Sequence, residues 1–256
     1  MGKLYERADL YDLLDSEPRF RMFERNWEAM LDGKDVRTLL DVSIGSGSAT
    51  LPAARLGIKI CGSDLSEAML ARCRKKAEAM GVAAELKQAD FRDLSCWEGR
   101  LFDCVASTGN ALPYVNNDDV LCALRRMDTL VRPGGYLCFD VRNWDKILRE
   151  RQRFYLYNPI FDGDTRVNMI QFWDYNSDGS MTFNICYTFE RENRIVGKEI
   201  FEEHYNPVAQ TLLLGQLRQM GYESIEVRGY PHRDGENIEE VEWYSVIARK
   251  MRETGE

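Results

Sequence analysis

The stretch that decides the fold runs from Thr38 to Thr50 and reads TLLDVSIGSGSAT. Its first half, TLLDVS, is a short apolar run of the kind that predicts a buried strand. Its second half, IGSGS, places Gly45 and Gly47 in a turn directly after that strand. Glycine has no Cβ, so the backbone of such a turn can pass close to a ligand. A strand that ends in a glycine turn is typical of the place where an α/β sheet binds a nucleotide-like molecule.

Outward from this stretch, strand-like and helix-like patterns alternate along the chain. We expect further strands near residues 58–64, 83–90, 102–109, 136–143, 222–230 and 240–250. We expect helices near residues 17–32, 50–57, 66–81, 118–131 and 207–221. The last of these has Pro207 in its first turn, and the sequence RPGG at 132–135 indicates a turn. Such alternation predicts an α/β fold with a doubly wound, mostly parallel sheet of seven strands.

The pattern changes between Phe154 and Tyr205, where the chain alternates in hydrophobicity without a helical period. The sequences NSDGS and ENR within this region are typical of hairpin turns. We therefore expect an antiparallel β insert after the fifth strand of the sheet. No long linker separates the insert, so the prediction is a single domain over residues 1–256. Its parts are a helical N-terminal segment, a ligand-binding half and the insert, at residues 1–35, 36–153 and 154–206.

The chain has 256 residues, of which 44% are hydrophobic and 30% charged, and its net charge is −8. This composition predicts a globular protein and argues against a nucleic-acid partner, whose binding requires a basic face. The N-terminal sequence MGKLYERADLYDLL is charged, and no run of 18 apolar residues occurs, so we expect neither a leader peptide nor a membrane partner. Seven scattered cysteines without a C-x-x-C pair fit a reducing compartment, so we expect a cytoplasmic protein.

Acidic residues follow the first three strands, at the sheet edge where open α/β folds bind ligands. Asp41 ends the first strand and would attract a cationic ammonium group. Asp64 ends the second strand, 19 residues after Gly45, and is suited to a ribose diol. Asp90 ends the third strand, and with Phe91 beside it is suited to an adenine ring. Each aspartate alone would equally fit a helix cap, but their order and spacing together indicate a nucleoside site.

A dinucleotide cofactor fits this pattern less well than a single nucleoside with an amino-acid end. The dinucleotide fingerprint requires a third glycine for close packing of helix on strand, and Thr50 stands near that position. Hydride transfer would also require a partner group, and the chain has only two histidines, His204 and His232. Asp41, just before the turn, instead suits the ammonium of an amino acid.

The series LLDVSIGSG, GSDLSEAML, QADFRDL, FDCVASTGNALPYV and VRPGGYLCFD resembles the motif series of class I S-adenosylmethionine-dependent methyltransferases over residues 38–140. The resemblance implies a Rossmann-like fold, S-adenosyl-L-methionine as cofactor and S-adenosyl-L-homocysteine as product. It implies a cofactor site made of Asp41, Ser43, Gly45, Ser46, Gly47, Asp64, Leu65, Met69, Asp90, Phe91 and Thr108. Ser43 departs from the family, which usually has a glycine there. If the strand continues to Ser43, that residue requires no positive φ, and we expect its hydroxyl near the cofactor's carboxylate.

A narrower resemblance concerns STGNALPYV and DVRNWDKIL, which are similar to segments of glycine N-methyltransferases. That family holds its amino-acid substrate with an asparagine after the fifth strand, and Asn143 matches it. The N-terminal sequence LYDLLDSEPRFRMF is similar to the family's cofactor-covering segment, which implies that Tyr11 and Arg21 cover the methionine end. The segment EEHYNPVA implies that Tyr205 lies on the substrate side, formed by the insert.

Methyl transfer from a sulfonium mainly requires alignment of the two reactants, so a strong catalytic base is optional. Solvent or Tyr205 would accept the proton of an amine. Arg142 and Arg166 are candidates to bind a substrate carboxylate, although exposed arginines more often form surface ion pairs. His204 is a weaker candidate for a base. Several aromatic residues of the insert are candidates to cover a substrate pocket, although strands favour aromatics in any case: Phe154, Tyr155, Tyr157, Trp173 and Tyr175.

Three functions remain open at this stage. The first is methylation of a small molecule, on the amine of an amino acid such as glycine or of a related compound. The second is methylation of an oxygen by the same fold, which an apolar acceptor pocket would favour. The third is a protein that binds the cofactor without catalysis. We expect no metal site, because histidines and carboxylates do not occur at ligand spacing. The insert is a candidate surface for homo-oligomers.

Overall fold

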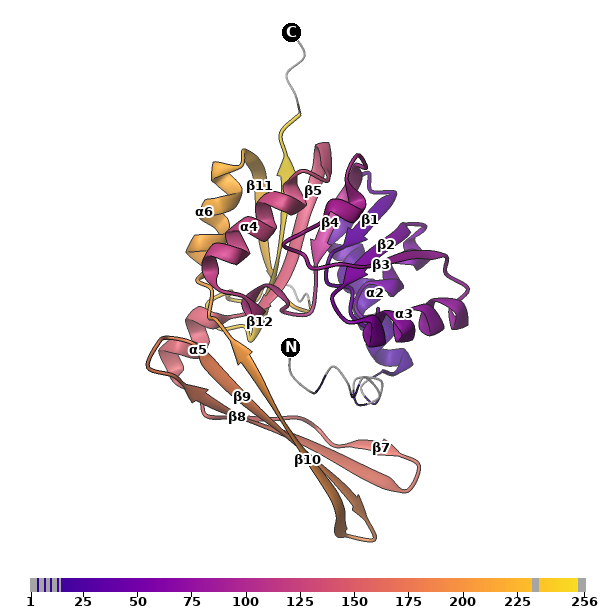
Figure 1. Ribbon diagram of the computed structural model, residues 1–256, viewed down its shortest axis with the longest axis vertical. Helices are drawn as coiled ribbons and strands as arrows, with labels where there is room; N and C mark the ends of the chain where they lie inside the picture. Colours follow the sequence, from indigo (N-terminus) through magenta and orange to yellow (C-terminus); the bar gives the residue numbers. More distant parts are fainter. Residues whose placement is uncertain are drawn as a thin grey trace.

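The computed structural model describes residues 4, 7, 10, 13, 15–231 and 235–252. Its main sheet has seven strands in the order β11-β12-β5-β4-β1-β2-β3, and only β12 runs antiparallel to its neighbours (Figure 1). The strands are β1 (Thr38–Asp41), β2 (Lys59–Asp64), β3 (Ala84–Gln88), β4 (Phe102–Ser107), β5 (Val131–Arg142), β11 (Tyr222–Gly229) and β12 (Trp243–Lys250). The predicted mostly parallel seven-stranded sheet is therefore confirmed.

Helices cover both faces of this sheet. They are α2 (Glu17–Leu31), α3 (Glu67–Ala79), α4 (Asn117–Asp128), α5 (Trp144–Glu150) and α6 (Gln210–Gln219). Leu40 of β1 packs in the core cluster that contains α4 and α6, whereas Leu39 packs in the cluster that contains α2 and α3. Successive strand residues point to opposite faces, so both faces of a doubly wound sheet must be apolar. In the described residues, no helix has the length and apolar content that a bilayer crossing requires.

Three local features differ from the sequence prediction. The expected helix at 50–57 is a 3-10 helix, η2 (Leu51–Leu56), which begins next to Pro52 and ends at Gly57 with φ of 81°. The RPGG segment is part of β5, because Gly135 passes so close to β4 that a Cβ would lie 2.9 Å from the Asp103 carbonyl oxygen. Helix α6 begins only at Gln210, because the preceding segment is fixed in extended form by the hydrogen bond from Asn206 N to the Pro113 carbonyl, 2.7 Å. Pro207 therefore precedes the helix.

The insert forms a second, antiparallel sheet that projects from the end of the first, next to α5 (Figure 1). Its strands are β6 (Phe154–Leu156), β7 (Ile160–Asp162), β8 (Thr165–Tyr175), β9 (Met181–Arg191) and β10 (Arg194–Tyr205). Both predicted hairpin turns are confirmed, since Asn176 N donates to Ser180 O at 2.9 Å, and Glu192 and Asn193 have φ of 49° and 61°. Alternate residues of β8 and β9 are buried, so one face of this sheet packs inward.

Candidate active site

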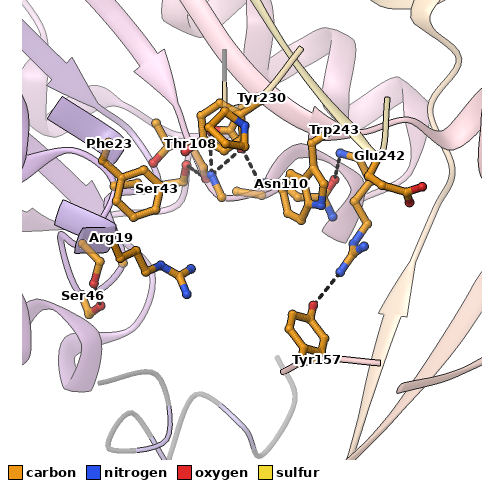
Figure 2. A pocket seen from close by; sticks show the side chains of 18 of the residues that line it. Arg19, Phe23, Ser43, Ser46, Thr108, Asn110, Tyr157, Tyr230, Glu242 and Trp243 are labelled. Atoms are coloured by element: carbon orange, nitrogen blue, oxygen red, sulfur yellow. Dashed lines mark hydrogen bonds between the residues drawn. The ribbon is translucent and has the colours of Figure 1, made fainter. Parts of the chain in front are cut away.

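A cavity of about 820 Å³ lies between the glycine turn, the N-terminal helix α2 and the inward face of the insert (Figure 2). Its walls come from the ends of β1, β2, β4 and β5, from strands of the insert, and from the loop before β12. This volume is typical of a pocket for a small organic ligand, which usually has roughly 300–1,000 Å³. The parallel strands therefore present their carboxyl ends to the cavity, as the sequence predicts.

The glycine turn forms one wall of the cavity. Gly45 and Gly47 have φ of 55° and 83°, whereas Ser43 is not among the residues with positive φ. Ser43 thus requires no positive φ, as expected, although β1 ends at Asp41 and does not continue to Ser43. The Ser43 hydroxyl lines the cavity and donates to the Thr108 carbonyl at 3.1 Å. A Cβ on Gly47 would lie 2.6 Å from Leu51 Cδ1 and 2.7 Å from Cys73 Sγ, so Gly47 provides close packing and does not line the cavity.

Asp41 lies beneath the turn and is completely buried. Its carboxylate accepts hydrogen bonds from the hydroxyls of Thr50 and Thr108 and from the Ser43 N–H at 3.0 Å. Burial raises the pKa of Asp41, and these hydrogen bonds oppose the rise. Because hydroxyl groups separate the carboxylate from the cavity, Asp41 orders the turn and does not line the cavity.

Of the predicted nucleoside residues, Asp64 and Met69 line the cavity, as do Ser46 and Thr108 of the neighbouring loops. The Asp64 carboxylate accepts from Gly45 N at 2.9 Å and from Ser66 N at 2.8 Å, and burial raises its pKa. It therefore joins the ends of β1 and β2 at the cavity wall.

Leu65, Asp90 and Phe91 do not line the cavity. Leu65 is 48% exposed, and Phe91 packs against the main core. Both oxygens of Asp90 accept from the guanidinium of Arg92, and this pairing holds the pKa of Asp90 below its usual value. In this structure the third strand thus supplies a surface ion pair and no wall of the cavity.

The start of α2 is fixed over the glycine turn by an ion pair. Lys76 Nζ of α3 lies 2.6 Å from Asp15 Oδ2 and donates to Ser46 Oγ at 2.8 Å and to Ser48 Oγ at 2.9 Å. Burial lowers the pKa of Lys76, and Asp15 opposes this shift. The ion pair connects the N-terminal segment, the glycine turn and α3, and therefore closes one side of the cavity.

The arginine of α2 that lines the cavity is Arg19, not Arg21. Arg21 is exposed and its Nε donates to Glu17 Oε1 at 3.0 Å. Arg19, with Phe23 one turn further on, faces the cavity, and its guanidinium carbon lies 5.4 Å from the centre of the Phe23 ring (Figure 2). Residues two positions apart lie on different faces of a helix, so Arg19 and Arg21 do not substitute for each other. Tyr11 lies outside the described residues.

The loop after β4 is held on β5 by a buried carboxylate. Asp140 accepts from Gly109 N at 3.0 Å and from Asn110 N at 3.2 Å, and burial raises its pKa to about 7. Asn110 has φ of 58°, and its side-chain oxygen accepts from Arg142 N at 2.9 Å. Neither Asp140 nor Asn110 is among the predicted site residues. An asparagine after a glycine is nevertheless a signal for left-handed backbone.

Arg142, at the end of β5, is a buried cation in the cavity wall. Its Nη2 donates to Tyr157 Oη at 3.2 Å (Figure 2), while its Nη1 has no hydrogen-bond partner. Among the described residues, no carboxylate oxygen lies within 4 Å of its guanidinium. Four aromatic rings surround it at 4.7–5.5 Å: those of Trp243, Tyr155, Trp173 and Phe183. A buried cation without a counter-ion is costly, so an anionic ligand group would be favoured here.

The neighbouring Asn143 does not line the cavity. Its Nδ2 donates to the carbonyls of Ile238 and Val241 at 2.9 and 3.1 Å, and its Oδ1 accepts from Lys146 N at 3.2 Å as the N-cap of α5. The side chain therefore holds the loop that carries Glu240 and Glu242, which do line the cavity.

Arg166 and His204 also lie away from the cavity. Arg166 pairs with Glu190, and His204 Nδ1 lies 3.2 Å from Thr182 Oγ1. Of the aromatic residues predicted to cover the pocket, Tyr155 and Tyr157 line the cavity, whereas Phe154 is 57% exposed and Tyr175 donates to the Gln152 carbonyl at 2.6 Å.

Tyr205 lines the cavity from the end of β10, opposite η4 (Leu112–Tyr114). Its hydroxyl lies 2.7 Å from that of Tyr114, which lines the cavity as well. Burial raises the pKa of Tyr205. Sequence reasoning missed Tyr114, and also the buried Glu203 two residues before Tyr205. The cavity thus has two walls. One contains the glycine turn and Asp64, and the other contains the Arg142 cation and the hydroxyls of Tyr114 and Tyr205.

The chain is similar to several known methyltransferases. Residues 39–135 match the family model described as "Methyltransferase domain". A putative methyltransferase of Bacillus subtilis, YqeM, is 30% identical over 141 residues, which cover 55% of this chain and 56% of that protein. A glycine/sarcosine/dimethylglycine N-methyltransferase of Actinopolyspora halophila is 24% identical over 250 residues, 95% of this chain and 41% of that protein. The chain spans about half the length of such curated relatives.

Among solved structures, an S-adenosylmethionine-dependent methyltransferase of Clostridium acetobutylicum matches with a TM-score of 0.76. The match covers 96% of this chain and 98% of that one at 15% sequence identity, and therefore includes the insert. At this identity the likeness concerns the fold. Residues 39–135 thus match a methyltransferase domain, and the chain as a whole shares the fold of a known S-adenosylmethionine-dependent methyltransferase.

Proposed function

We propose that this protein transfers a methyl group from S-adenosylmethionine to the amine of a small molecule that also carries a carboxylate, such as an amino acid. The observation that carries the proposal is the pairing within one cavity of the Asp64 and glycine-turn wall with the unpaired guanidinium of Arg142. The first wall fits a nucleoside with an amino-acid end, and the second fits an anionic acceptor.

The donor set of the first wall fits S-adenosylmethionine. Asp64 would accept from the ribose hydroxyls, and Ser43, Ser46 and Thr108 supply hydroxyls beside the turn. Arg19 would bind the carboxylate of the amino-acid end, since its Nε is buried without a hydrogen-bond partner. Bound there, S-adenosylmethionine supplies an electrophilic methyl group on sulfur. Met69 adds an apolar contact in the same wall.

The second wall favours an acceptor that carries both a carboxylate and an ammonium group. Arg142 would hold a carboxylate through a guanidinium that no protein carboxylate neutralises. Glu236, Glu240 and Glu242 also line the cavity, although Glu240 pairs with Arg149 and Glu242 with Lys146. The similarity to an N-methyltransferase for glycine, sarcosine and dimethylglycine supports the same acceptor class. Met169, Ile185 and Trp243 add apolar surface to the same wall, so transfer to an oxygen acceptor is the alternative that the assay must test.

The test is a transfer assay with methyl-labelled S-adenosylmethionine and a panel of glycine, sarcosine, dimethylglycine, alanine and a catechol. We expect transfer to at least one amino acid. The Arg142→Gln variant should raise the acceptor KM at least tenfold, because a charge-assisted hydrogen bond contributes about 1.5–3 kcal/mol. Its affinity for S-adenosylhomocysteine should stay within twofold. Arg153→Gln, which changes an exposed arginine just before the insert, is the matched control. Transfer to the catechol alone would contradict the amine acceptor.

A further inference from the structure

One buried carboxylate has no role in the site described so far. Glu203 of β10 is only 1% exposed, although its neighbours Glu202 and His204 are exposed. It faces inward with Phe201 and Tyr205, because alternate residues of a strand share a face. In residues 154–205, all of which the structure describes, it is the only carboxylate classed as buried. The fold gives no reason to keep a charge at an apolar position.

We infer that Glu203 is the final proton acceptor of the methyl transfer, connected to the acceptor amine through the hydroxyls of Tyr114 and Tyr205. This inference rests on the proposed function, since it concerns the same cavity and the same amine. It adds a route for the proton, which Tyr205 alone does not provide.

The three side chains are arranged in a defined order. The Tyr114 hydroxyl lies near enough to the Glu203 carboxylate to lower its pKa, and Glu203 Oε1 is buried without a hydrogen-bond partner. An ionised carboxylate only accepts, so Tyr114 must donate to it. The Tyr114 oxygen then accepts from the Tyr205 hydroxyl, 2.7 Å away. Tyr205 therefore has lone pairs left to accept an N–H from a ligand in the cavity.

The chemistry requires such a route because an amine reaches the site as an ammonium. One proton must leave the nitrogen before its lone pair can attack the methyl group. That proton passes to Tyr205, the Tyr205 proton passes to Tyr114, and the Tyr114 proton passes to Glu203. The N–C bond then forms, the C–S bond breaks, and its electron pair stays on the sulfur. Glu203 ends as a neutral acid, which suits its buried position.

The surroundings of Glu203 support this role. Burial raises its pKa to about 7, although the hydrogen bond from Tyr114 opposes the rise. A base titrating near neutrality is well matched to proton transfer at physiological pH. The other titratable or charged side chains that act on the relay are Tyr157 of the insert and Arg142 of β5, both through Tyr205. Arg142 lies in the cavity wall as well, so it binds the acceptor beside the relay.

The first test does not depend on activity. Infrared difference spectra between pH 5 and pH 9 detect the carbonyl band of a protonated carboxyl group, and subtraction of the Glu203→Gln spectrum isolates Glu203 from Asp140. We expect a band that titrates near the pKa of about 7. In Tyr114→Phe this titration should move to higher pH, because the variant removes a hydrogen bond that favours the ionised form. A Glu203 band that is absent at pH 5, or unmoved in Tyr114→Phe, would overturn the inference.

The second test uses the acceptor found in the transfer assay. Glu203→Gln should lower kcat about 100-fold, the lower end of the usual contribution of general acid–base catalysis, and abolish the acid limb of its pH profile. The acceptor KM and the affinity for S-adenosylhomocysteine should stay within twofold. Glu203→Asp should restore part of kcat together with an acid limb, and Glu202→Gln on the exposed face of β10 should match the wild type.

The results separate this inference from the proposed function. If Glu203→Gln keeps both the wild-type kcat and the acid limb, the relay is wrong although the methyl transfer stands. If the wild type methylates no amine, the proposed function fails, and the relay fails with it. In that case a normal infrared titration still shows that Glu203 changes its protonation near neutral pH.

Discussion

At the scale of single residues, the fold leaves two buried charged groups incompletely satisfied: the Arg142 guanidinium in the cavity wall and the Glu203 carboxylate behind it. Each has a buried polar atom without a partner, and such atoms reduce stability. A functional site often carries this cost, because the same atoms must be available to a ligand or a proton. The stability of the protein should therefore report on Glu203 directly.

Glu203→Gln should change the pH dependence of stability. The folded-state pKa is raised from 4.5 to about 7, so the folded protein binds the proton more tightly than the unfolded chain. Wild-type stability should thus fall relative to the variant as pH rises from about 4.5 to about 7, by about 3 kcal/mol in total. Urea unfolding at several pH values measures this. A difference between the two proteins that stays constant with pH would show that Glu203 does not titrate in this range.

At the scale of elements, the start of helix α2 is tied to α3 and the glycine turn. The ion pair of Asp15 and Lys76 and the hydrogen bonds to Ser46 and Ser48 provide this connection. Arg19 and Phe23 then reach the cavity from the following turns of the helix.

Lys76→Met should therefore weaken binding of S-adenosylhomocysteine. We expect a loss of about tenfold, equivalent to about 1.4 kcal/mol, because the ordering of α2 would have to be provided by the ligand. The acceptor KM should change little, since the insert is not involved. Lys75→Met, at an exposed position of the same helix, is the control. Calorimetric titration of the three proteins measures the effect, and equal affinities would show that the ion pair does not order the wall.

Elements were easier to predict from the sequence than the orientation of single side chains. The apolar runs that end in Asp41 and Asp64, and the glycines of the turn, follow from local rules and gave the sheet correctly. Arg19 and Arg21 lie two residues apart, and only the packing of α2 decides which one faces the cavity. Asn143 matched a family position, but its amide caps α5 and holds a distant loop.

Glu203 was missed for a different reason. The alternation of Phe201, Glu203 and Tyr205 is visible in the sequence and places the glutamate on the buried face of its strand. A single acidic residue at an apolar position of a strand is the signal that would have found it. Its link to Tyr114 was not predictable, because it depends on how the insert packs against η4.

At the scale of the whole molecule, the two sheets divide the work of the site. The seven-stranded sheet and the projecting insert are two separate sheets (Figure 1). In the proposed site, the first sheet and α2 form the cofactor wall, and the insert supplies Tyr155, Tyr157 and Tyr205 to the acceptor wall. Substitutions in the first part should change the affinity for S-adenosylhomocysteine, and those in the insert should change the acceptor kinetics. The central claim is therefore that the cofactor wall, formed by the glycine turn, Asp64 and α2, binds S-adenosylhomocysteine.

Calorimetric titration of the purified protein with S-adenosylhomocysteine tests that claim most directly, with NAD as the control ligand. The proposed site predicts one binding site per chain with a Kd in the micromolar range or below, and no heat of binding from NAD. Tight binding of NAD together with no binding of S-adenosylhomocysteine would contradict it, and would assign the glycine turn to a dinucleotide instead.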